Sequence, residues 1–283
     1  RPTYRLGICR SILLSYGVFP WHTSPMRQPR SSRARMLKFL THGFAGFLAA
    51  GTAQASGCGV EIAEQAKVAS VADDGGVVLA DGRRARLAAV QLPRTGWPLA
   101  EEARAALAAL SGRTVDLGYA ERGTDRRGDL LAHVFADDVW LQAKLIDEGL
   151  ARVATRADIS RCAGTLLKRE AAARAADRGI WSNAFYRVRD PNELGPEIGT
   201  FQIVEGKVVA ARIGRERTYL NFGADYRTDF TVTVSARDKK RLAKEGIDPA
   251  SWTGKTVRVR GWLSLVNGPE IELTHAEQIE VLD

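Results

Sequence analysis

A hairpin signal between residues 76 and 94 restricts the fold of this chain more than any other feature of its sequence. Two largely apolar runs, at 76–80 and 84–90, flank the dipeptide Asp81-Gly82, and Pro93 follows the second run. An Asp-Gly pair between such runs favours a two-residue turn, and this turn sets the register of the strands on either side. We therefore predict two antiparallel strands at 76–80 and 84–90.

The residues beyond this hairpin indicate helices and further short strands. Residues 99–110 place several leucines and alanines on one helical face, and Gly112 follows the end of that run. The other elements expected here are strands at 114–120 and 130–135, a helix that begins near Trp140 and ends at Gly149, and a helix at 158–178. Short strands with helices between and after them are typical of an OB-type barrel, so the predicted fold class is α+β, mainly β with helices. Trp140 and Trp181 are expected in its core rather than as base-stacking platforms.

Three segments carry a resemblance to a known family. They are residues 73–94, the sequence RGTDRRGDLLAHVF at 122–135, and LLKREAAARAADRGIWS at 166–182. The first segment is similar to the Asp-Gly-Asp-Thr and Arg-Leu-x-x-(Ile/Val)-Asp-(Ala/Thr)-Pro-Glu motifs of the thermonuclease family, the staphylococcal-nuclease-like OB-fold domains. The resemblance covers about residues 66–187 and implies an OB-fold barrel of the SNase type.

The same resemblance implies where the catalytic groups would lie, and most of those positions hold other residues. Gly75 and Gln91 stand where the family has metal-binding aspartates. Arg94 replaces the glutamate that activates water, and Asp129 replaces the arginine that clamps the phosphate. Only Arg86 keeps its catalytic counterpart. Hydrolysis of this kind needs carboxylates around a hard cation, a base for water and cations for the phosphate, so we expect a degraded site.

Two acidic residues remain near the predicted metal position. Asp73 matches the first aspartate of the family motif, and Asp74 follows it. A one-residue shift would bring Asp74 close to the position that Gly75 occupies. Such a shift requires a gap inside a hairpin whose Asp81-Gly82 turn fixes the register, so no metal site is assigned and no cofactor is expected.

The positive charge of the chain is concentrated in its first 55 residues. Eight of the 41 basic residues and none of the 33 acidic ones lie there, which leaves 33 of each in the remainder. We interpret residues 1–35 as translated upstream sequence, with a disordered basic tail as the alternative. Residues 36–55 resemble a signal peptide that is cleaved after Ala55, and their apolar run is too short to span a bilayer. The protein is therefore expected to be exported, periplasmic or secreted, with no transmembrane helix.

Two cysteines remain beyond this leader. Cys58 and Cys162 form an even pair in a chain that we expect to be exported, and a disulfide between them is the preferred interpretation. Two separate thiols are the first alternative. The second is a lipoprotein, because Ala55-Ser56-Gly57-Cys58 is a weak lipobox in which Cys58 would carry the lipid.

Residues 201–283 predict a second set of short strands. The expected elements are strands at 201–205, 207–213, 218–222, 229–235, 256–263 and 270–273, and a helix at 238–245. Its sequences GKTVRVRGWL and GPEIEL resemble OB-fold nucleic-acid-binding modules, which implies a second small OB-like β-barrel. The predicted domains are thus 56–187 and 201–283, with 188–200 as a linker or an ordered crossing.

The second region offers candidates for nucleic-acid binding. Arg215, Arg217 and Arg227 lie close in sequence to Tyr219, and rings interleaved with cations suit single-stranded nucleic acid. The alternative, in which the rings fill the barrel and the arginines face solvent, stays open because residues 191–283 hold 13 basic and 14 acidic residues. His275 is expected to be structural.

Together these features predict an exported thermonuclease-like protein with a degraded catalytic site that acts as a binding module. Its partner would be single-stranded nucleic acid or an envelope protein. The alternative is an active calcium-dependent nuclease that cleaves phosphodiesters, which would require calcium as its cofactor.

Overall fold

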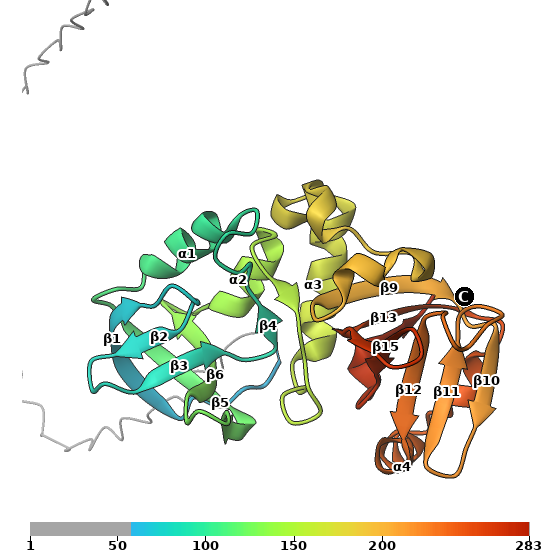
Figure 1. Cartoon of the computed structure of the whole chain (residues 1–283). Helices are drawn as coiled ribbons and strands as arrows, with labels where there is room; N and C mark the ends of the chain where they lie inside the picture. Colours follow the sequence, from blue (N-terminus) through green and yellow to red (C-terminus); the bar gives the residue numbers. More distant parts are fainter. Residues whose placement is uncertain (1–57, 283) are drawn as a thin grey trace, which may run out of the picture. The chain divides into compact units, whose positions relative to one another are not determined.

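The Asp81-Gly82 hairpin forms one side of a closed five-stranded barrel in the computed structural model, which describes residues 58–282 (Figure 1). The barrel strands are β1 (Glu64–Val71), β2 (Val77–Leu79), β3 (Arg84–Leu87), β5 (Thr114–Thr124) and β6 (Leu130–Ala136). Their order is β3-β2-β1-β5-β6, and a parallel pairing of β3 with β6 closes the ring. The predicted α+β class and OB-type barrel are confirmed.

Two features of this barrel differ from the prediction. Strand β1 was not expected, because only Ala66 and Val68 along it are buried and their alternation is weak. The single strand predicted at 84–90 is wrong: it divides into β3 and β4 (Val90–Gln91) at Ala89, whose φ is 63°. This bend takes β4 out of the barrel and pairs it with β8 (Arg152–Val153), so that Gln91 lies opposite Arg152.

Helices cover the barrel and follow it along the chain. They are α1 (Ala100–Ala108), α2 (Leu141–Asp147), which follows the short strand β7 (Val139–Trp140), and α3 (Ala163–Ala175). Helix α3 begins five residues later than predicted, because the side chain of Asp158 accepts hydrogen bonds from Arg156 and Ile159 packs in a separate small cluster. Trp140 and Trp181 are buried, as expected.

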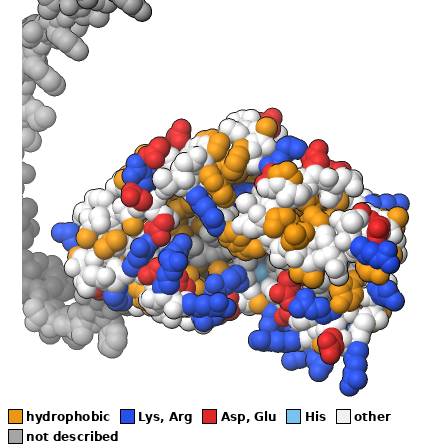
Figure 2. Space-filling model, in the orientation of Figure 1, with side chains coloured by type: hydrophobic (Ala, Val, Ile, Leu, Met, Phe, Trp, Pro, Cys, Tyr) orange, Lys and Arg blue, Asp and Glu red, His pale blue; other side chains and the backbone are white. Residues whose placement is uncertain are grey.

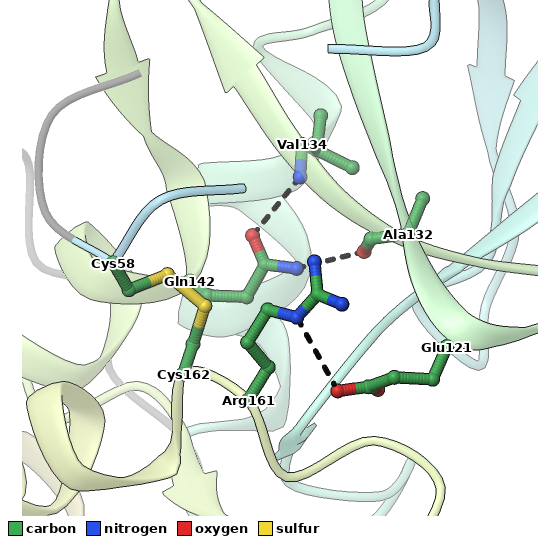
Figure 3. Close-up of a disulfide and its surroundings, with 7 residues drawn as sticks. All are labelled: Cys58, Glu121, Ala132, Val134, Gln142, Arg161 and Cys162. Carbon is green, nitrogen blue, oxygen red and sulfur yellow. Dashed lines mark hydrogen bonds and ion pairs between the residues drawn. A yellow bond between two sulfur atoms is a disulfide. The ribbon is translucent and has the colours of Figure 1, made fainter. Parts of the chain in front are cut away.

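A disulfide joins the start of the barrel to the start of α3 (Figure 3). It links Cys58 to Cys162 and confirms the predicted pairing. Beside it, the buried side chain of Gln142 donates to the carbonyl of Ala132 at 2.8 Å and accepts from the N–H of Val134 at 3.1 Å. This amide therefore ties α2 to β6 with its polar atoms satisfied.

The C-terminal region, residues 201–282, consists of two sheets. One contains β16 (Ile279–Val281), β13 (Thr256–Trp262) and β9 (Phe201–Lys207), and the other contains β10 (Ala210–Ile213), β11 (Arg217–Asn221), β12 (Thr231–Ser235), β15 (Pro269–Glu272) and β14 (Ser264–Leu265), each in that order. Both sheets are open by strand pairing, so the predicted second OB-like barrel is not confirmed. Helix α4 (Ala236–Lys244) follows β12 and begins where the Ser235 hydroxyl accepts the N–H of Asp238.

The segment between the two regions is ordered by short turns. Four 3-10 helices lie there, at Gly179–Ser182, Ala184–Tyr186, Pro191–Glu193 and Gly195–Glu197, and two more lie within the C-terminal region, at Pro249–Trp252 and Ala276–Gln278. The backbone of Arg189 bonds to Ile203 and Glu205 on β9, and its side chain pairs with Glu197 at 2.7 Å. All described residues fall within one compact unit, and the division into domains at 188–200 stays a prediction. The predicted leader, residues 1–55, lies outside the described residues.

A buried ion pair fastens α3 to the C-terminal region. Arg260 of β13 donates to Glu170 of α3 at 2.7 Å, and each side chain is only 1% exposed. Glu170 also accepts the N–H of Val153, and Arg260 also donates to Glu280. Within residues 58–282, no helix combines the length and apolar character needed to cross a bilayer.

Candidate functional site

A groove of about 1360 Å³ runs between the barrel and the C-terminal region, where Figure 2 shows the surface hollowed. The barrel contributes most of the positions that sequence comparison assigns to chemistry, and β13 and α4 contribute the opposite wall. Its charged and aromatic lining includes Arg86, Arg94, Arg126, Arg156, Arg237, Arg241 and Trp262 together with Asp74, Asp125, Asp158, Asp238 and Glu272, and Gly75 and Gln91 also line it. The groove therefore brings the predicted site of the barrel together with side chains of the second region that the sequence did not single out.

Four charged side chains at the barrel end of the groove neutralise one another. We name Asp74, Arg84, Arg86 and Asp129 the charge cluster. Arg84 bonds to Asp74 and lies 3.5 Å from Asp129, while Arg86 lies 3.7 Å from Asp74 and 3.8 Å from Asp129. Two carboxylates thus face two guanidinium groups. The cluster offers a phosphate no uncompensated positive charge.

The pKa of Asp74 reflects this pairing. Burial raises the pKa of its carboxyl, but the hydrogen bonds from the Gly76 N–H and from Arg84 outweigh burial and hold the pKa below its ordinary value. Asp74 is therefore an anion at neutral pH, and both of its oxygens face arginines. It is poorly suited to act as a base for water.

Asp73 points away from this cluster. Its carboxylate accepts from Arg104 at 3.1 Å, and its side chain is 85% exposed. Gly75, the next position of the motif, has φ of 79°, and a Cβ there would overlap Leu92. An aspartate at 75 would be strained by this backbone, which only glycine adopts readily.

Gln91 is engaged by a buried arginine. Arg152 donates to the Gln91 side-chain oxygen at 2.8 Å and to the Phe201 carbonyl at 3.1 Å. Its guanidinium lies 5.2 Å from the Phe201 ring centroid and 5.4 Å from that of Tyr186. Burial lowers the pKa of Arg152 to about 10, so the group stays charged at neutral pH. Gln91 thereby helps to hold the arginine that contacts Phe201 of β9.

Arg94 is held between two tryptophan rings. Its guanidinium lies 5.3 Å from the centroid of Trp97 in the barrel region and 4.8 Å from that of Trp262 on β13. Trp262 remains 50% exposed, so one part of its ring faces the groove. We call the contacts of Gln91 and Arg94 the joint, because Gln91 acts through Arg152 and Arg94 directly to connect the barrel to the C-terminal region.

These donors do not fit a calcium ion. Calcium takes six to eight oxygen ligands, largely from carboxylates. Gly75 supplies no side-chain oxygen, that of Gln91 already accepts from Arg152, and Asp74 is paired with arginines. Across residues 58–282, no group of three or more His, Cys, Asp or Glu side chains is placed to hold a metal ion.

Residues 84–183 match the model of the family described as Staphylococcal nuclease homologue. The matched segment includes β3, β5 and β6, which together with β1 and β2 form the closed barrel. This part of the chain is an SNase-like domain. No curated protein matches the chain. The SNase-like domain suggests a nuclease-related function and is compatible with nucleic-acid binding.

The predicted nucleic-acid-binding residues of the second region do not share one place. Arg215 lies in the turn between β10 and β11, and Tyr219 is 38% exposed on β11. Arg217 lies 3.8 Å from Glu270 and 3.9 Å from Glu272. Arg227 lies in the loop that enters the other end of β12, where its guanidinium is 5.6 Å from the Tyr226 ring centroid. None of the four lines the groove.

Sequence reasoning missed several residues that line the groove. Trp262 lies in the alternating stretch of β13, where the pattern indicates a strand and no binding role. Arg237 and Arg241 lie on α4, where the sequence predicts a helix at 238–245 and assigns its bases no role. A helical projection of residues 236–244 would have separated these bases from the buried Leu242 and given that signal.

Proposed function

We propose that this protein is a non-catalytic binding module in which the SNase-like domain and the C-terminal region together hold single-stranded nucleic acid in the groove. One observation carries the proposal. At two positions where the family places catalytic carboxylates, Gln91 instead holds Arg152, which donates to Phe201 of the C-terminal region, and Arg94 lies against Trp262 of that region. The module therefore uses those positions to build the joint rather than to activate water.

The loss of hydrolysis follows from the chemistry of these side chains. Arginine stays protonated at neutral pH and accepts no proton from water, and glutamine contributes only a neutral ligand. Asp129 places an anion where the resemblance expects a cation for phosphate. Loss of a single charge-stabilising group in an enzyme site typically costs about a hundredfold to a thousandfold in rate, so several changes together leave little catalysis.

Binding is supported by the residues along the groove. Trp262, which is 50% exposed, lines the groove together with the exposed side chains of Arg126 and Arg237. Aromatic rings stack on bases without regard to sequence, while arginines attract the phosphates. Single strands expose their bases and fit such a surface better than a duplex does.

The proposal places this module outside the cytoplasm. Its support is the disulfide between Cys58 and Cys162, a bond that is common in exported proteins, together with the signal-like residues 36–55. Mass measurement of the exported protein distinguishes the possibilities. Cleavage after Ala55 with loss of two hydrogens supports a secreted or periplasmic disulfide-bonded protein, whereas added acyl mass at Cys58 supports a lipoprotein.

The function is tested by incubating the protein with fluorescent single-stranded DNA and RNA, with and without calcium. We expect binding by anisotropy and intact oligonucleotides on a gel. Trp262→Ala should weaken binding about fivefold to a hundredfold, because one stacked base is worth roughly 1 to 3 kcal/mol. Tyr226→Ala removes an equally exposed ring that does not line the groove and is the matched control.

Other outcomes would identify a different function. Calcium-dependent cleavage that Arg86→Ala abolishes would support an active nuclease with a relocated metal site. Absence of binding at low salt would leave a protein partner in the envelope as the remaining function. Equal loss of binding in Trp262→Ala and Tyr226→Ala would place the nucleic acid outside the groove.

A further inference from the structure

The bases of the C-terminal region are concentrated at one end of it. Residues 191–283 contain 13 basic and 14 acidic residues, which leaves almost no net charge. Two short segments, 212–217 and 236–245, hold eight of these bases and only three of the acids. A region that is neutral on average therefore has a strongly positive part.

The fold brings these two segments together. Strand β11 pairs antiparallel with β12, so Arg217 lies opposite Ser235 and the β10–β11 turn reaches the start of α4. The N–H of Ala236 donates to the Glu216 carbonyl at 2.8 Å. A shallow hollow of about 310 Å³ lies between the turn and the helix, and its charged lining is Arg215, Glu216, Arg217, Lys239 and Lys240.

Helix α4 directs its bases outward. Leu242 and Asp238 are buried against the sheet, whereas Arg237, Lys240 and Lys244 are exposed. Figure 2 shows blue side chains gathering at the lower edge of the molecule, where Figure 1 places α4. We name this set, with Arg215 and Lys239, the α4 surface.

The cations of the α4 surface lack counter-charges. Arg215, Arg237, Lys239, Lys240 and Lys244 form no ion pair with any residue in the described range 58–282. By contrast, Arg241 on the same helix donates to the Thr274 carbonyl at 2.8 Å and lies 3.4 Å from Asp238. The unpaired cations remain available to an external anion.

The α4 surface is continuous with the groove. Arg237 and Arg241 on one side of α4 line the groove, and Lys239 and Lys240 on its other side line the hollow. An extended polyanion can therefore cross α4 and enter the groove towards Trp262, where Asp238 and Glu272 also line the wall.

We propose that the α4 surface binds the phosphate backbone of a single-stranded nucleic acid whose adjoining nucleotides occupy the groove. This inference rests on the proposed function and assigns the phosphate contacts to the second region. The alternative polyanion is an anionic membrane. Membrane-binding faces combine bases with several apolar side chains that insert, and beside these bases Ile213 is the one large apolar side chain exposed among the described residues of segments 212–217 and 236–245.

The test compares two triple variants by anisotropy with fluorescein-labelled dT20 at several salt concentrations. Arg215→Ala, Lys240→Ala and Lys244→Ala together remove three exposed cations of the α4 surface. Lys168→Ala, Lys207→Ala and Lys255→Ala together remove three exposed lysines that line neither the groove nor the hollow. Thermal melts of both variants should match that of the unmodified protein, because all six side chains are exposed.

We expect the α4 variant to bind dT20 at least tenfold more weakly at low salt, while the control triple binds like the unmodified protein. Each phosphate contact on a single strand contributes about 0.7 to the slope of log K against log salt, so the slope should become shallower by about 2. The control variant should keep the slope of the unmodified protein. This difference between variants supports the inference.

Three results would overturn it. If the unmodified protein binds dT20 without cutting it and the α4 variant binds equally well, the α4 surface carries no phosphate contact, while the proposed function stands. If the unmodified protein fails to bind dT20 or cleaves it, the proposed function fails and the inference with it. If the α4 variant loses binding to phosphatidylglycerol vesicles but not to dT20, the surface binds membranes.

Discussion

The charge cluster and the α4 surface both contain basic side chains, but only those of the charge cluster are paired with carboxylates. In the barrel, Arg84 and Arg86 face Asp74 and Asp129, and every charge has a partner within 4 Å. The cations of the α4 surface form no ion pair within the described range of the chain. The capacity to bind an anion thus depends on the nearest counter-charge and not on the number of bases.

Arg260 and Glu170 form an ion pair like those of the charge cluster, but their pair is buried from solvent. Both side chains are 1% exposed, and together they connect α3 with β13. Charges in this position must be paired, because an isolated buried ion is expensive. The following experiments separate buried pairs, exposed pairs and unpaired cations, in order of expected effect.

Removing one partner of the buried pair should have the largest effect. Arg260→Ala leaves the buried Glu170 with only Arg174, 3.6 Å away, as a cation, and loss of a buried partner costs about 3 to 5 kcal/mol of unfolding free energy. Urea unfolding measures this loss. Arg113→Ala, which breaks an exposed pair with Asp137, is the control and should cost no more than about 1 kcal/mol. Equal losses in both variants would mean that Arg260 does not stabilise α3 against β13.

Protonation of His275 should weaken the contact between the regions. Its ring lies 2.8 Å from the Thr155 hydroxyl, and burial, followed by the nearby Arg241, lowers the pKa of His275 to about 4. The unfolded chain has a histidine pKa near 6.5, so the stabilisation is complete above pH 6.5 and is lost as the pH falls towards 4. The full shift corresponds to roughly 3 kcal/mol.

The measurement is the unfolding free energy at pH 7 and at pH 4, with His275→Gln as the comparison. This variant should lose less stability between the two pH values than the unmodified protein. His133, whose pKa is also lowered to about 4 by burial and by Arg161, keeps its own contribution in both proteins. An identical pH dependence in the two proteins would exclude His275 as the source.

Restoring acidic residues at the joint should destabilise the protein without restoring hydrolysis. Arg94→Glu removes a cation that lies beside Trp97 and Trp262, and each cation–π contact is worth about 0.5 to 1 kcal/mol at exposed sites. Combined with Gln91→Asp, it still leaves Gly75 without a ligand. We expect a loss of about 1 to 2 kcal/mol in urea unfolding and intact DNA in the presence of calcium. Calcium-dependent cleavage by this double variant would show that the groove can still assemble a metal site.

Unpairing the charge cluster should have the smallest effect on stability and should increase binding. Asp129→Ala leaves Arg84 and Arg86 with a single carboxylate between them, so a phosphate could approach. We expect a change of about 1 kcal/mol or less in unfolding free energy, because the guanidinium side of each pair stays partly exposed and Asp74 remains as a partner. Binding to dT20 should tighten about threefold and become more salt-dependent. Unchanged binding would indicate that nucleic acid does not reach this end of the groove.

The barrel could be predicted because its signals are local. The Asp81-Gly82 turn and the apolar patterns that follow it predict the positions of β2, β3, β5 and β6 to within a few residues. Strand β1 was not predicted because its buried side chains are small and few. Its hydrogen bonds form when the ring closes, and its own sequence pattern does not indicate them. The bend at Ala89 was not predicted either, because a positive φ at alanine is imposed by the pairing of β4 with β8.

The site could be predicted only in part. The sequence identified that Gln91 and Arg94 replace carboxylates, since this requires only alignment with a motif. It did not identify what they contact, because Arg152 and Trp262 lie 61 and 168 positions further along the chain. The α4 surface was missed for a related reason. The nearly equal numbers of basic and acidic residues in 191–283 describe an average, whereas the fold gathers many of the basic side chains at one end of the region.

The bond between Cys58 and Cys162 spans 104 positions and encloses all five strands of the barrel. A protease that cuts one exposed loop inside this interval would leave two fragments that stay covalently attached. The nicked protein would run as one band on a non-reducing gel and would separate into two only after a thiol reductant is added. Such a tether favours survival in protease-rich surroundings, where a single cleavage would otherwise release a piece of the barrel.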